Sequence, residues 1–365
     1  MSQGAPVPPR RGRGALSNRE GRFERTRVEV GPDIEPDPDV DPLADPPPLA
    51  TTVTPERTKS ILTTNESPDV GFEQSINPYR GCEHGCVYCF ARPTHAYLGL
   101  SPGLDFETKI FSKPDAATLL RAELERKSYV CRTVALGANT DAYQPIERRL
   151  GITRGIVEVL SEHRHPVMII TKSDLVLRDL DLLGPMGEAR LAAVMVSVTT
   201  LDPALARRME PRAATPARRL ETVRRLTDAG VAVGVLAAPM IPGLNDPELE
   251  AIVDAAAAAG AVTAGYVLLR LPHEIKDLFR EWLETHYPLK KDRVLGILRE
   301  MRGGKLYDAA FGDRMRGRGA HAFLLARRFE VALRRTGLGH RDIALDESAF
   351  RVPPRPGSQG TLFPE

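Results

Sequence analysis

Three cysteines within one short segment are the residues whose type and spacing point most directly to chemistry. Cys82, Cys86 and Cys89 follow the pattern C-x3-C-x2-C, with Gly81 and Gly85 beside them. Cysteine thiolates are the usual ligands of iron–sulfur clusters, and ferredoxin-type sites supply four of them. Three thiolates on one loop leave a fourth iron without a protein ligand. An iron that is open in this way favours chemistry on a substrate or cofactor over simple electron transfer.

A structural zinc site is the alternative for the same cysteines. Zinc sites usually combine two separated pairs of ligands, and this sequence has no second C-x2-C pair. His84 or His95 could supply a fourth ligand, so zinc stays open at this point. Cys131, at the start of an expected strand, is interpreted as a small buried apolar residue.

Apolar segments that alternate with amphipathic segments are expected to position the cysteine loop. Strands are expected over residues 75–78, 133–136, 167–171, 193–198, 231–237 and 265–269, which are rich in Val and Ile. Helices are expected over residues 116–127, 153–163, 216–229 and 247–260. This alternation predicts an α/β fold with a parallel sheet, and six units suit a partial (β/α)6 barrel. The cysteines follow the first strand, at the edge where such folds place their sites.

Composition along the chain predicts four parts. Residues 1–50 are rich in Arg, Pro and Asp and are expected to be a disordered extension. The partial barrel is expected over residues 51–272, a mostly helical region over 273–345 and a flexible tail over 346–365. A net charge of +2 implies no nucleic-acid partner by itself. No apolar run is long enough to span a membrane, and cysteines that ligate metal favour a reducing cytoplasm.

The cysteine segment resembles the C-x3-C-x-aromatic-C motif of the radical S-adenosylmethionine (SAM) superfamily, with Tyr88 in the aromatic position. The wider stretch 77–92 is similar to the branch that includes spore photoproduct lyase, and the resemblance covers residues 60–345. It implies that the three cysteines ligate a catalytic [4Fe–4S] cluster and that SAM chelates the open iron. One electron then cleaves SAM to methionine and a 5′-deoxyadenosyl radical. A donor such as flavodoxin or ferredoxin would supply the electron.

The resemblance also implies contacts with SAM from polar residues at strand ends. These candidates are Asn139, Thr140, Lys172, Ser197, Glu210 and Arg218. Asn139 or Thr140 would bind the methionine part, Lys172 would pair with the carboxylate, and residues 239–246 resemble the adenine-contacting region. Each candidate also has an ordinary interpretation, because Ser and Thr are common in loops and charged side chains often form caps or surface ion pairs.

One position departs from the spore photoproduct lyase pattern. That enzyme uses a cysteine near the end of the second strand as a hydrogen-atom donor, and the matching residue here is Ala138. Cys131 lies roughly 20 Å upstream along an extended strand and would be a poor substitute. The departure argues against spore photoproduct repair and leaves radical SAM chemistry untouched. A tyrosine is an alternative donor, and the candidates are Tyr79, Tyr88, Tyr97 and Tyr266.

Two further segments point toward DNA. The basic residues Arg314, Arg316, Arg318, Arg327, Arg328, Arg334 and Arg335 could contact phosphates or form a solvated helix face. The peptide Gln359–Phe363 resembles the short motifs with which bacterial repair proteins dock on the sliding clamp.

The leading hypothesis is therefore a cytoplasmic radical SAM enzyme, of lyase or oxidoreductase type, that acts on nucleic acid as in DNA repair. One alternative is radical SAM modification of a protein or small metabolite, which would share every cofactor residue. Another is a non-catalytic adaptor, stabilised by a cluster or by zinc, that docks on the clamp.

Overall fold

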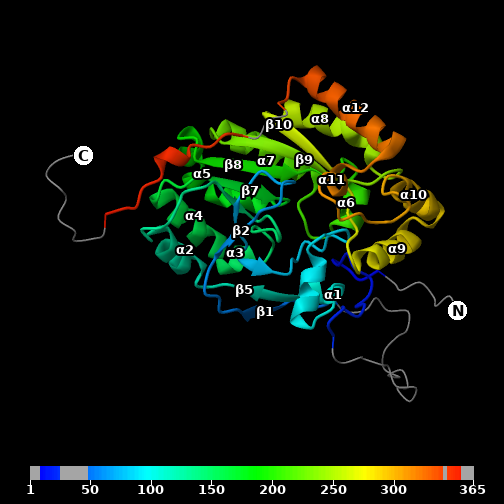
Figure 1. Ribbon diagram of the computed structural model, residues 1–365, viewed down its shortest axis with the longest axis horizontal. Helices are drawn as coiled ribbons and strands as arrows, with labels where there is room; N and C mark the ends of the chain where they lie inside the picture. The colour runs from blue at the N-terminus through cyan, green and yellow to red at the C-terminus, as the bar shows by residue number, and fades with distance from the viewer. Residues whose placement is uncertain (1–8, 25–47, 340–342, 355–365) are drawn as a thin grey trace, which may run out of the picture.

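A seven-stranded sheet is the centre of this computed structural model, which describes residues 9–24, 48–339 and 343–354 (Figure 1). Within them the strand order is β10-β9-β8-β7-β6-β3-β2. The strands are β2 (Leu62–Thr64), β3 (Gln74–Ile76), β6 (Val134–Leu136), β7 (Val167–Thr171), β8 (Ala192–Ser197), β9 (Ala232–Met240) and β10 (Thr263–Leu268). All neighbours pair in parallel except β2 and β3. The α/β fold with a parallel sheet that the sequence predicts is thus confirmed.

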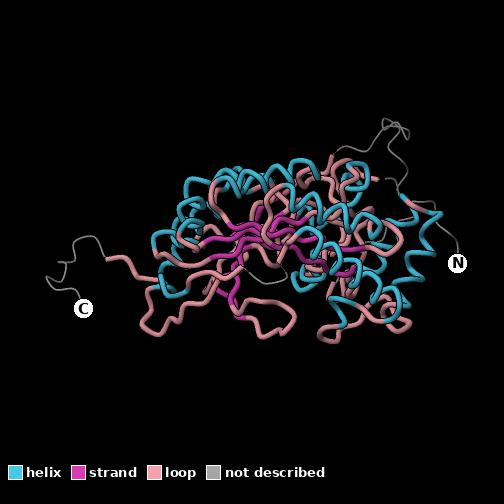
Figure 2. Tube along the Cα trace, turned by 90° about the horizontal axis from the view of Figure 1, so that it is seen from above, coloured by secondary structure: helices cyan, strands magenta, loops and turns pink. Residues whose placement is uncertain are grey.

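Helices link the parallel strands and cover one face of the sheet (Figure 2). They are α2 (Ala116–Leu124), α3 (Glu147–Leu150), α4 (Ile152–Glu162), α5 (Leu180–Glu188), α6 (Pro203–Met209), α7 (Pro216–Asp228) and α8 (Leu249–Ala258). The four helices expected from the sequence correspond to α2, α4, α7 and α8. The sequence does not predict helix α5, because Gly184, Pro185 and Gly187 interrupt its helical pattern.

The two faces of the sheet are packed to different degrees. Side chains alternate between faces along a strand, so neighbours such as Ile169 and Ile170 point in opposite directions. Ile169 is fully buried beneath the helices, as are Val194 and Val235. Ile170 is only half-buried, and it pairs in register with the half-buried Met195. The sheet therefore has one closed face and one partly open face, as expected for an incomplete barrel.

A second, three-stranded sheet carries the cysteine loop. Its order is β1-β5-β4, and its parts are β1 (Thr52–Pro55), β4 (Tyr79–Arg80) and β5 (Lys109–Ser112). The loop leaves β4 and ends in the 3₁₀ helix η1 (Arg92–Leu98), which the short helix α1 (Leu104–Thr108) follows. The sequence does not predict this sheet, because strands of two to four residues show no periodicity.

The chain after β10 is mainly helical and connects the two edges of the main sheet. It forms α9 (Ile275–His286), α10 (Pro288–Glu300), α11 (Asp313–Arg316) and α12 (Gly319–Thr336), the last packed on α8. Asp69, in the loop between β2 and β3, pairs with Arg314 of α11 and accepts a hydrogen bond from the Gly312 amide at 2.6 Å. Because β2 is one edge strand and α11 contacts β10, the other, this pair joins the two sides of the partial barrel.

The expected disorder of residues 1–50 needs a correction for residues 9–24. Arg13, Ala15 and Leu16 are at most 7% exposed and pack beside the cysteine loop. Composition misled the sequence analysis, because this segment is ordered by partners distant in the sequence. The rest of the extension up to residue 47, and the clamp-like peptide Gln359–Phe363, lie outside the described residues. In the described chain, no helix is both long and apolar enough to cross a bilayer.

The assignment of faces can be tested with two adjacent isoleucines. Ile169→Ala is expected to lower the free energy of unfolding by about 2–5 kcal/mol, because it leaves a cavity under the helices. Ile170→Ala is the matched control and is expected to cost less than about 2 kcal/mol, because its site is already partly open to water. Urea unfolding followed by circular dichroism measures both. Equal losses would contradict the assignment.

Candidate active site

The cysteine loop lies at the carboxyl edge of the main sheet, and its thiols are largely shielded from water. Cys82 and Cys86 are 7% and 8% exposed, Cys89 is half-buried, and all three are free thiols. The Cys82 amide donates to the Phe106 carbonyl at 3.0 Å, and the Cys89 amide donates to the Cys86 carbonyl at 3.2 Å. Gly81, at φ +79°, has no space for a side chain, since a Cβ would lie 2.8 Å from the Phe106 oxygen. The backbone of the loop is thus closely fixed.

The surroundings of these thiols suit a soft metal centre. Burial raises the pKa of the Cys82 and Cys86 thiols, and nearby negative groups, Asp141 and Glu210 respectively, add to the effect. A thiol with a raised pKa becomes a thiolate when a metal binds it. Soft sulfur ligands in a buried loop fit an iron–sulfur cluster.

The zinc alternative finds little support in the positions of the two histidines. His84 is buried, with Nδ1 3.3 Å from Asp141 Oδ2. His95 packs edge-on against Phe106, and its Nε2 lies 2.9 Å from the Lys109 carbonyl oxygen. Both imidazoles are thus engaged with protein groups, so neither is a ready fourth ligand that would complete a tetrahedral zinc site with the three cysteines.

Asp141 connects the cysteine loop to the ends of two strands. Its Oδ1 accepts hydrogen bonds from the Thr171 hydroxyl at 2.8 Å and the Tyr143 amide at 2.9 Å, and its Oδ2 accepts one from the Lys172 amide at 2.7 Å. Burial alone would raise the pKa of this carboxyl, but His84 and these donors outweigh it and lower the pKa to about 2. The sequence does not single out Asp141, because its partners are far apart in the chain.

Four of the predicted SAM contacts lie at the carboxyl edge near the cysteines. Lys172 follows β7, and its ammonium lies 6.0 Å from the centroid of the Tyr88 ring. Its positive charge also acts on Cys86. Ser197 is buried at the end of β8, and Asn139 is half-buried after β6. The Thr140 hydroxyl is already engaged, since it donates to the Tyr79 carbonyl at 2.8 Å.

The other two predicted contacts, Glu210 and Arg218, have different surroundings. Glu210 is fully buried, pairs with Arg219, and accepts hydrogen bonds from the hydroxyls of Tyr88 and Thr199. Arg219 also donates to the Ser197 carbonyl at 3.0 Å. Arg218 is mostly exposed and pairs with Asp174 at 2.7 Å. Glu210 thus supports the cysteine loop through Tyr88, whereas Arg218 lies on the surface.

Arg219 is a residue that the sequence analysis missed although a signal was present. After Pro216 at its start, the buried positions of α7 are Arg219, Thr222, Val223 and Leu226, which follow the i, i+3, i+4, i+7 spacing of an inner helix face. The spacing therefore placed Arg219, and not Arg218, toward the core. A buried arginine needs a carboxylate, and Glu210 is that partner.

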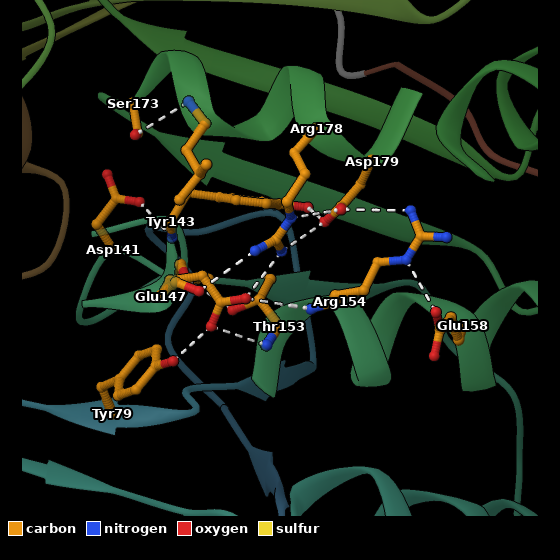
Figure 3. A network of polar contacts seen from close by, with 12 residues as sticks. Tyr79, Asp141, Tyr143, Glu147, Thr153, Arg154, Glu158, Ser173, Arg178 and Asp179 are labelled. Atoms are coloured by element: carbon orange, nitrogen blue, oxygen red, sulfur yellow. Dashed lines mark hydrogen bonds and ion pairs between the residues drawn. The ribbon is translucent and has the colours of Figure 1, made fainter. Parts of the chain in front are cut away.

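A second polar network, missed from the sequence, supports the neighbouring loops (Figure 3). Glu147 accepts hydrogen bonds from the Tyr79 hydroxyl and the Thr153 amide and pairs with Arg178 at 2.8 Å. Asp179 likewise pairs with Arg178 and accepts from the Tyr143 hydroxyl at 2.9 Å. Burial and the adjacent carboxylates raise the pKa of both phenols. Tyr79 is one of the candidate hydrogen-atom donors from the sequence, and its hydroxyl is therefore already bonded to Glu147.

An aromatic and basic group lies beside Cys89. Phe90 is 45% exposed, and the Arg270 guanidinium, after β10, lies 5.2 Å from the centroid of its ring. Arg270 forms no ion pair within the described residues, and its Nε is buried without a partner there. Its Nη1 contacts the sulfur of Met315 in α11 at 3.6 Å. This group is called the Phe90–Arg270 patch below.

Of the two interpretations of the basic sequence near the C-terminus, the solvated helix face fits the structure better than a phosphate surface. Five of its arginines, Arg314, Arg318, Arg327, Arg328 and Arg335, form ion pairs with carboxylates. Their charge is thereby largely compensated.

A pocket of about 430 Å³ lies at the amino edge of the sheet and contains no thiol. It is lined by residues 65–67 and 70–73 and by Arg132, Thr133 and Glu347. We therefore place the candidate site at the cysteine loop.

Comparisons with known proteins point to one superfamily. The profile of the radical SAM superfamily matches residues 76–256, which include all three cysteines. An uncharacterised protein of Mycobacterium tuberculosis is 36% identical over 294 residues, which cover 80% of this chain and 82% of the relative. An uncharacterised protein of Methanocaldococcus jannaschii is 26% identical over 60% of this chain and 78% of its own length.

Solved structures of spore photoproduct lyase share the fold. One variant, with bound AdoMet and dinucleoside spore photoproduct, is 17% identical, has a TM-score of 0.56 and matches 78% of each chain. A structure complexed with dinucleoside spore photoproduct is 16% identical over the same shares, also with a TM-score of 0.56. At this identity the likeness shows the fold alone.

The buried pair under Tyr88 gives a testable prediction. Glu210→Gln removes the charge that compensates Arg219 and is expected to lower the free energy of unfolding of the apo-protein by about 3–5 kcal/mol. Glu221→Gln is the matched control, because its partner Arg224 is about half exposed, and it is expected to cost about 0–1 kcal/mol. Equal stability of the two variants in urea unfolding would show that Glu210 does not support the loop.

Proposed function

Because the chain belongs to the radical SAM superfamily, whose members use a [4Fe–4S] cluster and SAM, we propose that Cys82, Cys86 and Cys89 ligate that cluster. The observation that carries the proposal is one loop with three free thiols, two of them buried, at the carboxyl edge of a parallel sheet. When bound, the cluster and SAM supply a 5′-deoxyadenosyl radical. The protein has to bind and orient these groups and to exclude water.

The residues at the strand ends are suited to hold SAM. Lys172 has no carboxylate partner within the described residues, and it pairs with the carboxylate of SAM in our proposal. Ser197 and Asn139 offer a hydroxyl and an amide at the ends of neighbouring strands, and the Thr140 oxygen can still accept a hydrogen bond. Glu210 acts indirectly, through Tyr88, because its oxygens are already occupied.

We propose a nucleic acid or a nucleotide-derived group as the substrate. The Phe90–Arg270 patch supports this choice, because an exposed aromatic ring offers a stacking surface for a base and an unpaired guanidinium binds phosphate. The similarity in fold to a lyase that has been crystallised with a dinucleoside photoproduct is consistent with it. The paired arginines of α11 and α12 contribute less, since their charges are compensated.

The residues near the site argue for a reaction other than the repair of spore photoproduct. Ala138 follows β6 and carries no thiol. Cys131 precedes β6 and so lies at the opposite edge of the sheet. The Tyr88 hydroxyl, bonded to Glu210, is the phenol next to the cysteines. Lyase or oxidoreductase chemistry on another nucleic-acid lesion or modification fits these residues.

The partners follow from this chemistry. An external reductant, for which flavodoxin and ferredoxin are our candidates, has to deliver one electron. We place the protein in the cytoplasm, where thiols stay reduced. Docking on the sliding clamp through Gln359–Phe363 stays a prediction, because this peptide lies outside the described residues.

The first test uses anaerobically reconstituted protein with SAM and dithionite, with and without UV-irradiated DNA. We expect release of 5′-deoxyadenosine that is abolished when Cys82, Cys86 and Cys89 are replaced by Ala, because the cluster then has no ligands. Cys131→Ala is the control and should keep both the cluster absorbance and the release. Stimulation by irradiated DNA would support a repair substrate, and product analysis by mass spectrometry would identify the reaction class.

Two results would contradict the proposal. Wild-type protein that takes up no cluster, or takes one up without cleaving SAM, would favour the adaptor. Cleavage that DNA and RNA leave unchanged, but that a protein or small metabolite stimulates, would overturn the nucleic-acid substrate.

The Phe90–Arg270 patch makes a separate prediction about binding. Arg270→Gln is expected to weaken binding of a labelled single-stranded oligodeoxynucleotide roughly tenfold and to lower the slope of log affinity against log salt by about 1. Arg335→Gln is the matched control, because this arginine is paired with Asp254. Fluorescence anisotropy in a salt series measures both, and equal affinities would remove Arg270 from the nucleic-acid surface.

A further inference from the structure

The amino-terminal residues 13–18, called the strap below, pack against the back of the cysteine loop. Gly14 touches the loop backbone directly, because a Cβ at this position would lie 1.7 Å from the Gly85 oxygen. Ala15 and Leu16, beside it, are 1% and 3% exposed. Only glycine at position 14 therefore permits this approach of two backbones.

A fully buried carboxylate joins the strap to the loop. Glu107 of α1 is 0% exposed and accepts hydrogen bonds from the amides of Gly14 at 3.0 Å and Ala15 at 2.8 Å. Its other strong partner is Arg92, also 0% exposed, with which it forms an ion pair. The carboxylate thus accepts its hydrogen bonds from the strap on one side and from Arg92 on the other.

Arg92 connects Glu107 to Cys86, one of the proposed cluster ligands. Its Nε donates to the Cys86 carbonyl at 2.8 Å, and its Nη1 donates to the Gly103 carbonyl at 2.8 Å. The path from Gly14 through Glu107 and Arg92 to Cys86 consists of charge-assisted hydrogen bonds between buried groups, which are the strongest kind in proteins. Any shift of the strap changes the position of Glu107 and, through Arg92, of the Cys86 backbone.

The strap also holds the loop from a second side. Arg13 Nη2 donates to the Thr51 hydroxyl oxygen at 3.0 Å, and this hydroxyl donates to Glu83 Oε1 at 2.7 Å. Glu83 stands next to Cys82, is buried and pairs with Arg212 at 2.9 Å. The start of the cysteine loop, beside Cys82, and its middle, at Cys86, are therefore each connected to Arg13–Ala15 through one buried acid.

Further contacts fix the strap to the C-terminal helices. The Ser17 hydroxyl donates to Glu281 of α9 at 2.7 Å, and Asn18 exchanges hydrogen bonds with Asp105 of α1 at 2.8 and 2.9 Å. The strap thus lies between α1, α9 and the cysteine loop, and it covers a side of the loop that would otherwise face water.

We propose that the strap is a positioning element for the iron–sulfur cluster: it sets the backbone of Cys82–Cys89 through Glu107 and Glu83 and keeps water and oxygen from the loop. This inference rests on the part of the proposed function that assigns cluster ligation to the three cysteines. It is independent of SAM cleavage and of the substrate. Partners one step removed from metal ligands typically change metal affinity 10–100-fold when they are lost.

The test is a pair of Gly→Ala variants of the full chain, reconstituted anaerobically. Gly14→Ala forces the strap away from Gly85, whereas Gly296→Ala in α10 meets nothing within 4 Å. We expect Gly14→Ala to keep its apo-state circular dichroism, to lose cluster absorbance in air about tenfold faster than wild type, and to show a changed electron paramagnetic resonance spectrum of the reduced cluster. Gly296→Ala should match wild type in all three.

A second variant covers the case in which Gly14→Ala does not fold. Arg13→Gln removes the hydrogen bonds to the backbone carbonyls of Glu107 and Leu49 and to the Thr51 hydroxyl without any steric clash, and it is measured in the same way. Folded variants with wild-type iron content, lifetime in air and resonance spectrum would overturn the role of the strap. A wild-type protein that binds no cluster would instead overturn the proposed function, so the two failures are distinguishable.

Discussion

Buried carboxylates around the cysteine loop are the constraint on which the rest of the site depends. Glu83, Glu107 and Glu210 are at most 3% exposed and the Asp141 side chain is 9% exposed, and a charge in such a place is stable only with donors around it. Each takes its donors from several elements that are distant in the sequence. Loss of its donors would leave each of these acids as an uncompensated buried charge and would destabilise the fold. The loop, the strand ends and the N-terminal strap are therefore fixed relative to one another.

The uneven packing of the sheet complements this rigidity. The helix-covered face is closed and supplies the main apolar core, whereas residues such as Ile170 and Met195 on the other face stay half-buried. A partial barrel of this kind keeps space for a cofactor beside a rigid rim. The rigid rim holds the cysteines, and the open face leaves the polar strand ends Lys172 and Ser197 near them.

The sequence predicted those parts that repeat a pattern or a motif, and missed those that depend on distant pairs. Strand β7 was expected over its observed residues because a buried parallel strand is a continuous apolar run. Strand β4 has two residues and no pattern. Glu107 looks like an ordinary charged residue in the sequence, since its partners Gly14 and Ala15 lie more than 90 positions away. Residues 13–18 were assigned to disorder for the same reason.

The position of the strap in the chain has a consequence for assembly. Residues 13–18 are synthesised before the barrel, and Glu107 and Glu281, which hold them, follow 93 and 264 residues after Gly14 and Ser17. Such long loops close late, because their entropy is lost before the contacts form. The strap can therefore make all of its contacts only after α9 has been synthesised, when Glu281 becomes available to Ser17. Delivery of iron to a nascent chain would meet an open loop, and delivery to the finished protein a closed one.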